Sequence, residues 1–253
     1  IGIFLNSQIL GLALKPKIKK LYLVKVKKQI IVVGGGGFTH NEDSDLDQFF
    51  LDQISKKNCS IGFLPTASND DSRKTELFYK RFKNTNFKVS HFNLVSSVKG
   101  FENWISNLDA IYVGGGNTKF VLDLWEKNNL FEIFKEIYNS GIILSGVSAG
   151  AACWFDYFLT DSDGPGFKPL RGIGLISGSF TPHYSDAKRA EKYRENIKNK
   201  TLPSGVAVDD GVAVLFIDGK PTEVYSSRES HNAYFVNQNK QINLKEYIKI
   251  NNE

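Results

Sequence analysis

Short apolar runs of strand length alternate with segments of helical period along the first 150 residues. The runs are QIIVV (29–33), SIGFLP (60–65), KVSHFNLV (88–95), AIYVGGG (110–116) and GIILSG (141–146). Between the first two runs, Leu46, Phe49 and Phe50 recur at helical spacing. Strands that alternate with helices build parallel βαβ units, in which helices cover both faces of the sheet. The pattern predicts an α/β protein with a mostly parallel sheet between helices.

The limits of several helices can also be predicted. Ser72 and Asn117 lie where the N-caps of two helices are expected, because their side chains can accept a hydrogen bond from a free backbone N–H. Residues 119–139 carry two sets of apolar residues that are separated at Asn128-Asn129. This stretch predicts two short helices, or one helix that is broken there.

The pattern changes after residue 200. VAVDDGVAVLFIDGKPTEVYSS reads as strand, turn, strand, turn, strand, and Asp218-Gly219 is a hairpin signal. The C-terminal end of the sheet is therefore expected to be antiparallel. Because no linker-like stretch divides the chain, we expect one domain over residues 28–253.

The formal net charge of +5 comes from one end of the chain. Residues 1–28 hold seven lysines and no acidic residue, and the remaining basic residues are slightly outnumbered by the 27 acidic ones. A nearly neutral body lacks the basic stripe of a nucleic-acid-binding protein. We therefore expect neither a nucleic-acid nor a membrane partner.

Residues 1–27 are expected to form an extension outside the fold. Their apolar stretch precedes the lysines, which is the reverse of the order in a secretory signal, and it is too short to span a bilayer. A chain that started at Val26 would begin just before the first strand. The two cysteines, Cys59 and Cys153, are isolated and match no metal-ligand spacing. We expect a cytoplasmic protein with no metal and no cofactor.

The sequence Gly146-Val147-Ser148-Ala149-Gly150 lies where a buried strand meets a helix. G-x-S-x-G at such a junction is the nucleophile-elbow pattern, in which a sharp turn exposes the serine hydroxyl. The backbone N–H of Ala149 would supply one oxyanion donor. A strand–helix turn in which the serine is merely small is the structural alternative.

A serine nucleophile needs a base and an acid. Of the four histidines, His183 lies after a short strand-like run and a proline, on a loop where a base is expected. Asp209 and Asp210 follow the strand GVAV, and they would point in opposite directions, so at most one can orient the imidazole. The sequence alone leaves the choice between them open.

Two glycine clusters follow strands. Glycines 114–116 end the run AIYVGGG, and the backbone there could supply a second oxyanion donor just before Asn117. VVGGGGF at 32–38 lacks the register of a dinucleotide-binding loop, since Thr39 stands where the third glycine belongs. The first cluster is expected to let the chain leave the sheet tightly.

Six segments together resemble the peptidase S51 family, which includes dipeptidase E (aspartyl dipeptidase) and the related cyanophycinase. They are IIVVGGGGF, FLPTAS, YVGGGNT, GVSAGAACWF, GLISGSFTPHY and GVAVDDG, in the family's order over about residues 28–226. The resemblance implies a serine hydrolase on a single flavodoxin-like domain, similar to class I glutamine amidotransferases.

The resemblance also implies roles for individual residues. Ser148 matches the nucleophile, His183 the base, and Asp210 the place of an acid that is commonly glutamate in the family. Gly116 and Ala149 match the oxyanion donors. The remaining candidates for support of the site or binding of an acidic substrate side chain are Asn117, Asp163, Arg189 and Arg194.

The combined interpretation is a serine exopeptidase for short peptides, with dipeptides that carry an N-terminal acidic residue as candidate substrates, acting as a monomer or homodimer. A cyanophycinase-like or other amide hydrolase is the first alternative. A ligand-binding protein that keeps the fold without catalysis is the second.

Overall fold

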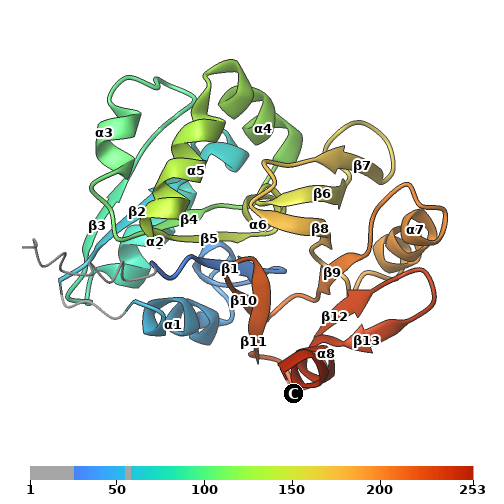
Figure 1. Ribbon diagram of the computed structural model, residues 1–253. Coiled ribbons are helices and arrows are strands. Elements are labelled where there is room, and N and C mark those ends of the chain that lie inside the picture. The colour runs from blue at the N-terminus through green and yellow to red at the C-terminus, as the bar shows by residue number, and fades with distance from the viewer. Residues whose placement is uncertain (1–25, 55–57, 253) are drawn as a thin grey trace, which may run out of the picture.

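The computed structural model describes residues 26–54 and 58–252, and in them the chain forms two mixed sheets, of which the first is mostly parallel (Figure 1). The first sheet has the strand order β11-β10-β1-β5-β4-β2-β3. Its five parallel strands are β1 (Gln29–Val33), β2 (Ser60–Leu64), β3 (Lys88–His91), β4 (Ala110–Val113) and β5 (Ile143–Val147). The C-terminal strands β10 (Val212–Ile217) and β11 (Lys220–Ser226) extend it antiparallel beside β1.

Helices cover both faces of the first sheet, as the sequence predicts. The side chains of β1 alternate between two cores, with Ile31 and Val33 in one and Ile30 and Val32 in the other. On the first face lie η1 (Phe38–His40), α1 (Ser44–Asp52) and α2 (Ser72–Phe82). On the second face lie α3 (Phe101–Ile105), α4 (Thr118–Lys127) and α5 (Leu130–Ser140).

The second sheet is a difference from the sequence-based prediction, which placed all strands in one sheet. Its order is β13-β12-β9-β8-β6-β7. The strands are β6 (Phe155–Thr160), β7 (Lys168–Arg171), β8 (Ile176–Thr181), β9 (Gly205–Val208), β12 (Ala233–Val236) and β13 (Gln241–Asn243). Helices α7 (Ala187–Lys198) and α8 (Leu244–Asn252) accompany it, and the short helix α6 (Ala149–Ala152) connects β5 to β6.

The turn between β9 and β10 explains the difference. β9 pairs with β8 and β12 in the second sheet, whereas β10 pairs with β1 and β11 in the first. The turn Asp209-Asp210-Gly211 therefore carries the chain from one sheet to the other instead of closing a hairpin. Gly211 takes a φ of +72°, a conformation that side chains other than glycine rarely adopt.

The predicted boundaries are confirmed in part. Asn117 is the N-cap of α4, and its side chain accepts a hydrogen bond from Phe120 N at 2.8 Å. The N-cap of α2 is Asp71, one residue before the predicted Ser72, and Asp71 Oδ1 accepts a hydrogen bond from Arg73 N. α4 and α5 are separate helices, because Asn129 turns the chain at a φ of 55°. The strand predicted over residues 88–95 ends at His91.

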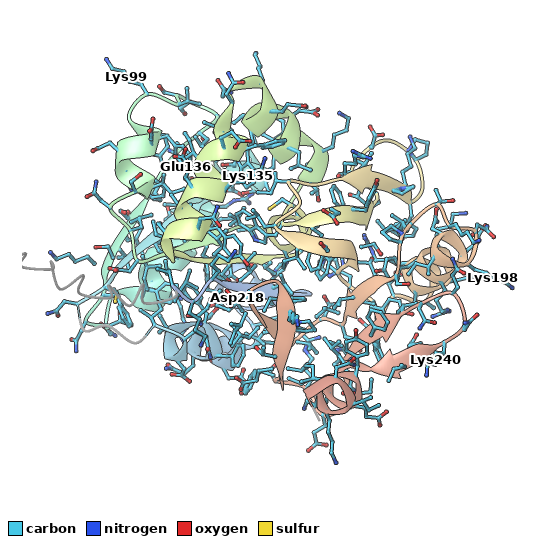
Figure 2. The ribbon with its side chains drawn as sticks, viewed as in Figure 1. Lys99, Lys135, Glu136, Lys198, Asp218 and Lys240 are labelled. Atoms are coloured by element: carbon cyan, nitrogen blue, oxygen red, sulfur yellow. The ribbon has the colours of Figure 1, made fainter. Side chains whose placement is uncertain are left out.

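Charged side chains are spread over the surface of the described residues. Lys99 and Lys198, for example, project from opposite sides of the molecule in Figure 2. None of the described helices is long and apolar enough to cross a bilayer. The prediction that residues 1–27 are an extension falls almost entirely on residues 1–25, which lie outside the described residues.

Candidate active site

Ser148 lies on a strained turn between β5 and α6. Its backbone has a φ of 53° and a ψ of −110°, which is rare for a residue other than glycine. The neighbouring glycines are required by space, since a Cβ at Gly146 would lie 2.1 Å from the carbonyl oxygen of Gly150. A Cβ at Gly150 would lie 2.2 Å from the carbonyl oxygen of Val113. The G-x-S-x-G spacing thus lets the turn pack against β4 and leaves the hydroxyl in a cavity.

His183 is the histidine that meets this hydroxyl. It follows β8 in the second sheet, and its Nε2 lies 2.7 Å from Ser148 Oγ. The other three histidines make different hydrogen bonds through Nδ1. His91 contacts Tyr79 Oη, His40 contacts Thr39 Oγ1, and His231 contacts the carbonyl oxygen of Asp210. A loop at a strand end was the signal that distinguished His183 in the sequence.

Asp210 lies on the other side of the imidazole. Its Oδ1 lies 2.5 Å from His183 Nδ1. The hydrogen bond from His183 lowers the pKa of Asp210 below its usual value, against the opposing effect of burial. Asp209 makes a different contact, since its Oδ2 accepts a hydrogen bond from Asn232 N at 2.9 Å. Burial raises the pKa of Asp209 above its usual value. Of the two aspartates, only Asp210 contacts the imidazole.

The three residues come from different parts of the molecule. Ser148 follows a strand of the first sheet, His183 follows a strand of the second, and Asp210 lies on the connection between the two. They meet at the junction of the two sheets, because Asp210 lies on the connection from β9 of the second sheet to β10 of the first. The order Ser, His, Asp along the chain is compatible with this meeting point.

A cavity of about 250 Å³ opens beside Ser148, and Gly116 and Ala149 line it together with Ser148 and His183. Ala149 is the first residue of α6, so its N–H has no partner within the helix. Gly116 takes a φ of +149°, and a Cβ there would lie 2.1 Å from the carbonyl oxygen of Ala67. Both positions can therefore present backbone N–H groups toward an oxygen atom in the cavity.

The same cavity holds one ion pair. Arg189 is 7% exposed, and its Nη2 lies 3.0 Å from Oδ1 of Asp161. Its guanidinium also lies over the ring of Phe167, 4.6 Å from the centroid. The side chain of Asp161 remains 61% exposed. The cavity therefore contains both a cationic and an anionic group beside Ser148.

Asp161 was not singled out in the sequence, where Asp163 was the candidate. The structure places Asp163 away from the cavity lining, with Oδ2 3.9 Å from Lys168 Nζ. Both aspartates lie in one TDSDG loop, and nothing in the letters shows which of them faces the cavity. Arg194 also lies apart from the lining and donates a hydrogen bond to Tyr184 Oη at 3.1 Å.

Gly35 is a second residue that sequence reasoning missed. A Cβ at this position would lie 1.9 Å from Asp210 Oδ1 and 2.9 Å from the His183 ring. The backbone of the first glycine cluster therefore packs directly on the His183–Asp210 pair. The four consecutive glycines were visible, but their partner lies about 175 residues away in the sequence.

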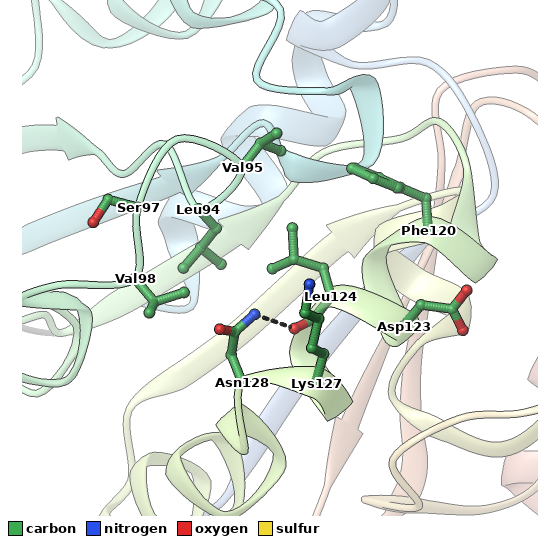
Figure 3. Close-up of a pocket in the computed structure, with 9 residues that line it drawn as sticks. All are labelled: Leu94, Val95, Ser97, Val98, Phe120, Asp123, Leu124, Lys127 and Asn128. Carbon is green, nitrogen blue, oxygen red and sulfur yellow. Dashed lines mark hydrogen bonds between the residues drawn. The ribbon is translucent and has the colours of Figure 1, made fainter.

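A larger cavity lies elsewhere. It has a volume of about 410 Å³ between the 94–98 loop and α4, where Leu94, Val95, Val98 and Leu124 give it a mostly apolar lining (Figure 3). Asp123 and Lys127 contribute its charges, and neither a histidine nor an elbow serine lines it. The smaller cavity at Ser148 is therefore the better candidate for chemistry. Within residues 26–54 and 58–252, no cluster of histidine, cysteine or acidic side chains is arranged to hold a metal ion.

Comparisons with known proteins identify the family of the chain. A family model described as "Peptidase family S51" matches residues 30–224. The chain is 42% identical over 212 residues to "Uncharacterized peptidase YgaJ" of Bacillus subtilis (strain 168), covering 83% of this chain and 92% of that protein. It is 27% identical over 203 residues to "Peptidase E" of Haemophilus influenzae (strain ATCC 51907), covering 76% and 88% of the two chains.

A solved structure has the same fold. The crystal structure of a peptidase from an acI-B1 Actinobacterium superimposes with a TM-score of 0.65 and 16% sequence identity. The match covers 88% of this chain and 96% of that one. At this identity the likeness concerns the fold alone.

Proposed function

The chain belongs to peptidase family S51, and we propose that it is a serine exopeptidase that cleaves very short peptides through Ser148, His183 and Asp210. The observation that carries the proposal is the unbroken hydrogen-bonded line from Ser148 Oγ through the imidazole to Asp210, with distances of 2.7 and 2.5 Å. This arrangement supplies a nucleophile, a base and a group that orients the base.

The proposed reaction has two halves. Ser148 Oγ attacks the scissile carbonyl carbon while His183 Nε2 takes the hydroxyl proton, and the N–H groups of Gly116 and Ala149 stabilise the resulting oxyanion. The intermediate collapses when His183 gives the proton to the leaving amine, and the acyl group stays on Ser148. Water then attacks the acyl-enzyme with His183 as the base, and this step regenerates the serine.

The size and charge of the cavity support an exopeptidase. About 250 Å³ beside Ser148 suits one residue and not a long chain. Asp161 could pair with the free α-amino group of an N-terminal residue, and Arg189 could pair with an acidic side chain in the bidentate manner of Arg–carboxylate contacts. Because Arg189 already pairs with Asp161, an acidic substrate would have to share that guanidinium. We therefore propose a moderate preference for N-terminal Asp or Glu.

We also propose a more specific fold type for the first sheet. The parallel strands of the first sheet run β3-β2-β4-β5-β1. A flavodoxin-like sheet has the strand order 2-1-3-4-5. The two orders agree when β2 is counted as the first strand, β3, β4 and β5 as the next three, and β1 as the fifth. We propose on this basis that the first sheet is of the class I glutamine amidotransferase-like type, with residues 28–253 as one folded unit.

Two measurements test the function. A library of Asp-Xaa, Glu-Xaa, neutral and β-linked dipeptides would be incubated with the wild-type protein and with Ser148→Ala, and a fluorophosphonate would label reactive serine. We expect hydrolysis and labelling in the wild type, and loss of both in Ser148→Ala with its melting temperature unchanged. Full hydrolysis by Ser148→Ala would reject the mechanism, and cleavage of β-linked peptides alone would favour an isopeptide hydrolase.

Arg189→Gln tests the selectivity separately. If Arg189 binds the acidic side chain, kcat/KM for Asp-Xaa should fall relative to that for Ala-Xaa by roughly 10-fold or more. An unchanged ratio between the two substrates would contradict the role of Arg189 while leaving the triad proposal intact.

A further inference from the structure

The segment Ser226–His231 runs from the last residue of β11 toward β12 and contacts the turn that carries Asp210. We call it the clamp segment. Ser227 donates two hydrogen bonds to the carbonyl oxygen of Gly211, from N at 2.9 Å and from Oγ at 3.1 Å. His231 Nδ1 lies 2.6 Å from the carbonyl oxygen of Asp210. The clamp segment is therefore hydrogen-bonded to the backbone of Asp210 and of Gly211.

Arg228 extends this contact across the turn. A Cβ at Gly211 would lie 2.7 Å from Cδ and Nε of Arg228, so the arginine side chain lies directly on the residue after Asp210. Its guanidinium then makes a bidentate pair with Asp43, with Nε 3.1 Å from Oδ1 and Nη2 2.7 Å from Oδ2. A third contact joins Nη2 to Glu42 Oε2 at 3.2 Å.

Asp43 belongs to the loop that follows β1 and carries the first glycine cluster. Its Oδ2 would lie 2.4 Å from a Cβ at Gly36, and the adjacent Gly35 packs on the carboxylate of Asp210. Gly211 N also donates to the carbonyl oxygen of Gly35 at 2.9 Å. The ion pair between Arg228 and Asp43 thus closes a ring of contacts around Asp210.

We propose that Arg228 is a positioning residue, which through its ion pair with Asp43 holds the turn that aims the Asp210 carboxylate at His183. The inference rests on the proposed function, because it gives Arg228 a purpose only if Asp210 orients the base. Neither Arg228 nor Asp43 lines the cavity at Ser148, so neither would touch the peptide.

The charges around Asp210 are consistent with this role. His183, Arg228 and His231 all help to lower its pKa, with the hydrogen bond from His183 the largest contribution. Ser185 Oγ lies 3.5 Å from Asp210 Oδ2, and the nearby acids are Asp43 and Asp209. The Arg228 guanidinium pairs with Asp43 and also lowers the pKa of Asp210, so it offsets the repulsion of these carboxylates and favours the ionised form of Asp210 that the mechanism needs.

A purely structural role would give a different signature from a positioning role. Arg228 is about one-third exposed, and a partly exposed ion pair contributes little to overall stability. A small displacement of a catalytic group, in contrast, can cost on the order of 100-fold in rate. Removal of the Arg228 side chain should therefore lower kcat strongly and change the free energy of unfolding only a little.

The experiment compares Arg228→Gln, Arg228→Lys and Asp43→Asn with the matched control Arg73→Gln. Arg73 makes an equivalent bidentate pair with Asp71 at 3.2 and 2.9 Å, on the exposed start of α2. For each variant we would measure kcat and KM on the best dipeptide, the rate of fluorophosphonate labelling of Ser148, and the melting temperature.

We expect Arg228→Gln and Asp43→Asn to lower kcat and the labelling rate by roughly 10–100-fold with KM and melting temperature nearly unchanged. Arg228→Lys keeps the charge without the fork and should recover part of the loss. Arg73→Gln should match the wild type.

Three results would overturn the inference. They are full kcat in Arg228→Gln, a loss that is matched by a collapse in melting temperature, and a rate for Arg228→Lys no better than that for Arg228→Gln. If the fluorophosphonate labels Ser148 equally fast in the wild type and in Arg228→Gln, this inference is wrong and the proposed function is unaffected. A wild type that neither hydrolyses the dipeptides nor reacts with the fluorophosphonate would remove the proposed function and this inference with it.

Discussion

Gly35 shows how strongly the site depends on a residue with no side chain. Its backbone conformation is one that other residues adopt, so its requirement is one of space alone. A Cβ there would lie 1.9 Å from Asp210 Oδ1. Since the aspartate is hydrogen-bonded to His183 and backed by the clamp segment, it cannot withdraw without losing contact with the imidazole.

Gly35→Ala should therefore lower kcat by roughly 100-fold or more, because it displaces the carboxylate that orients the base. The measurement is kcat on the best dipeptide, with circular dichroism to check that the fold is kept. Gly100→Ala is the matched control, because a Cβ at that position meets nothing within 4 Å. Gly100 has a φ of +84°, so its variant should lose some stability and keep its activity. Equal activity in the two variants would contradict the prediction.

The site residues differ in how far the sequence could predict them. Ser148, His183 and the pair Asp209-Asp210 were singled out because each stands at a strand end beside residues typical of a turn. The family resemblance then favoured Asp210, and the structure places the Asp210 carboxylate against the imidazole of His183. Asp161 and Gly35 were missed because their importance comes from segments that are distant in sequence and meet only after folding.

At the scale of elements, the N-cap of α4 connects stability to the site. Asn117 accepts the hydrogen bond of Phe120 N, and its own backbone follows the proposed oxyanion donor Gly116. Loss of an N-cap side chain typically costs about 1 kcal/mol. Frayed first-turn residues in α4 would also loosen the backbone at Gly116.

Asn117→Ala should therefore lower the free energy of unfolding by about 1 kcal/mol and also reduce kcat, by roughly 10-fold. Asp71→Ala removes the N-cap of α2, away from the site, and should cost similar stability with no loss of kcat. Urea unfolding and steady-state kinetics on both variants check the prediction. A drop in kcat of the same size in both would show that stability alone sets activity.

Helix α1 carries a buried acid whose protonation should be visible in stability. Asp47 accepts hydrogen bonds from Phe38 N at 3.1 Å and from Arg81 Nε at 2.9 Å, yet burial raises its pKa to about 6. An acid whose folded pKa lies above its unfolded value binds protons more tightly in the folded state. Stability therefore falls as the pH rises from about 4 to about 6.

The pKa of Asp47 is near 3.9 in the unfolded chain and about 6 in the folded one. This difference lowers the free energy of unfolding by about 3 kcal/mol between low and neutral pH. Asp47→Asn stays neutral at every pH and should lack that slope. Urea unfolding from pH 4 to pH 7 gives the free energy of unfolding of both proteins. We expect the wild type to lose stability relative to Asp47→Asn as the pH rises. Parallel pH profiles for the two proteins would refute the assignment.

The first sheet was predictable element by element, whereas the sequence indicated only β8 and β9 of the second sheet and not that they form a separate sheet. Strands β1, β2, β4 and β5 are fully or almost fully buried, so their apolar runs stand out against the helical segments between them. The edge strand β7 reads KPLR and is half-exposed, and β6 mixes Asp156 and Tyr157 into its apolar run. Local patterns this weak cannot specify with which sheet a strand pairs.

At the scale of the whole molecule, aromatic side chains join the two sheets. Phe155 of β6 stacks on Phe180 of β8 with centroids 4.6 Å apart, and it meets the edge of Phe216 of β10 at 5.6 Å. All three are buried in the core that also holds Ile30 and Leu144 of the first sheet. The residues proposed for catalysis come from both sheets, so the packing at this junction also sets their relative positions.

Phe155→Ala should lower the free energy of unfolding by roughly 3–5 kcal/mol, because it opens a cavity between the sheets. Since the core is shared, both sheets should lose protection together in one cooperative transition. Hydrogen exchange of amides in β2 and β12, with urea unfolding followed by tryptophan fluorescence, would report on the two sheets separately. Ile250→Ala is the control, because Ile250 is 68% exposed and its loss should change stability by less than about 0.5 kcal/mol. Faster exchange confined to β12, or two separate transitions, would mean that the sheets unfold as independent units and that the triad spans a boundary between them.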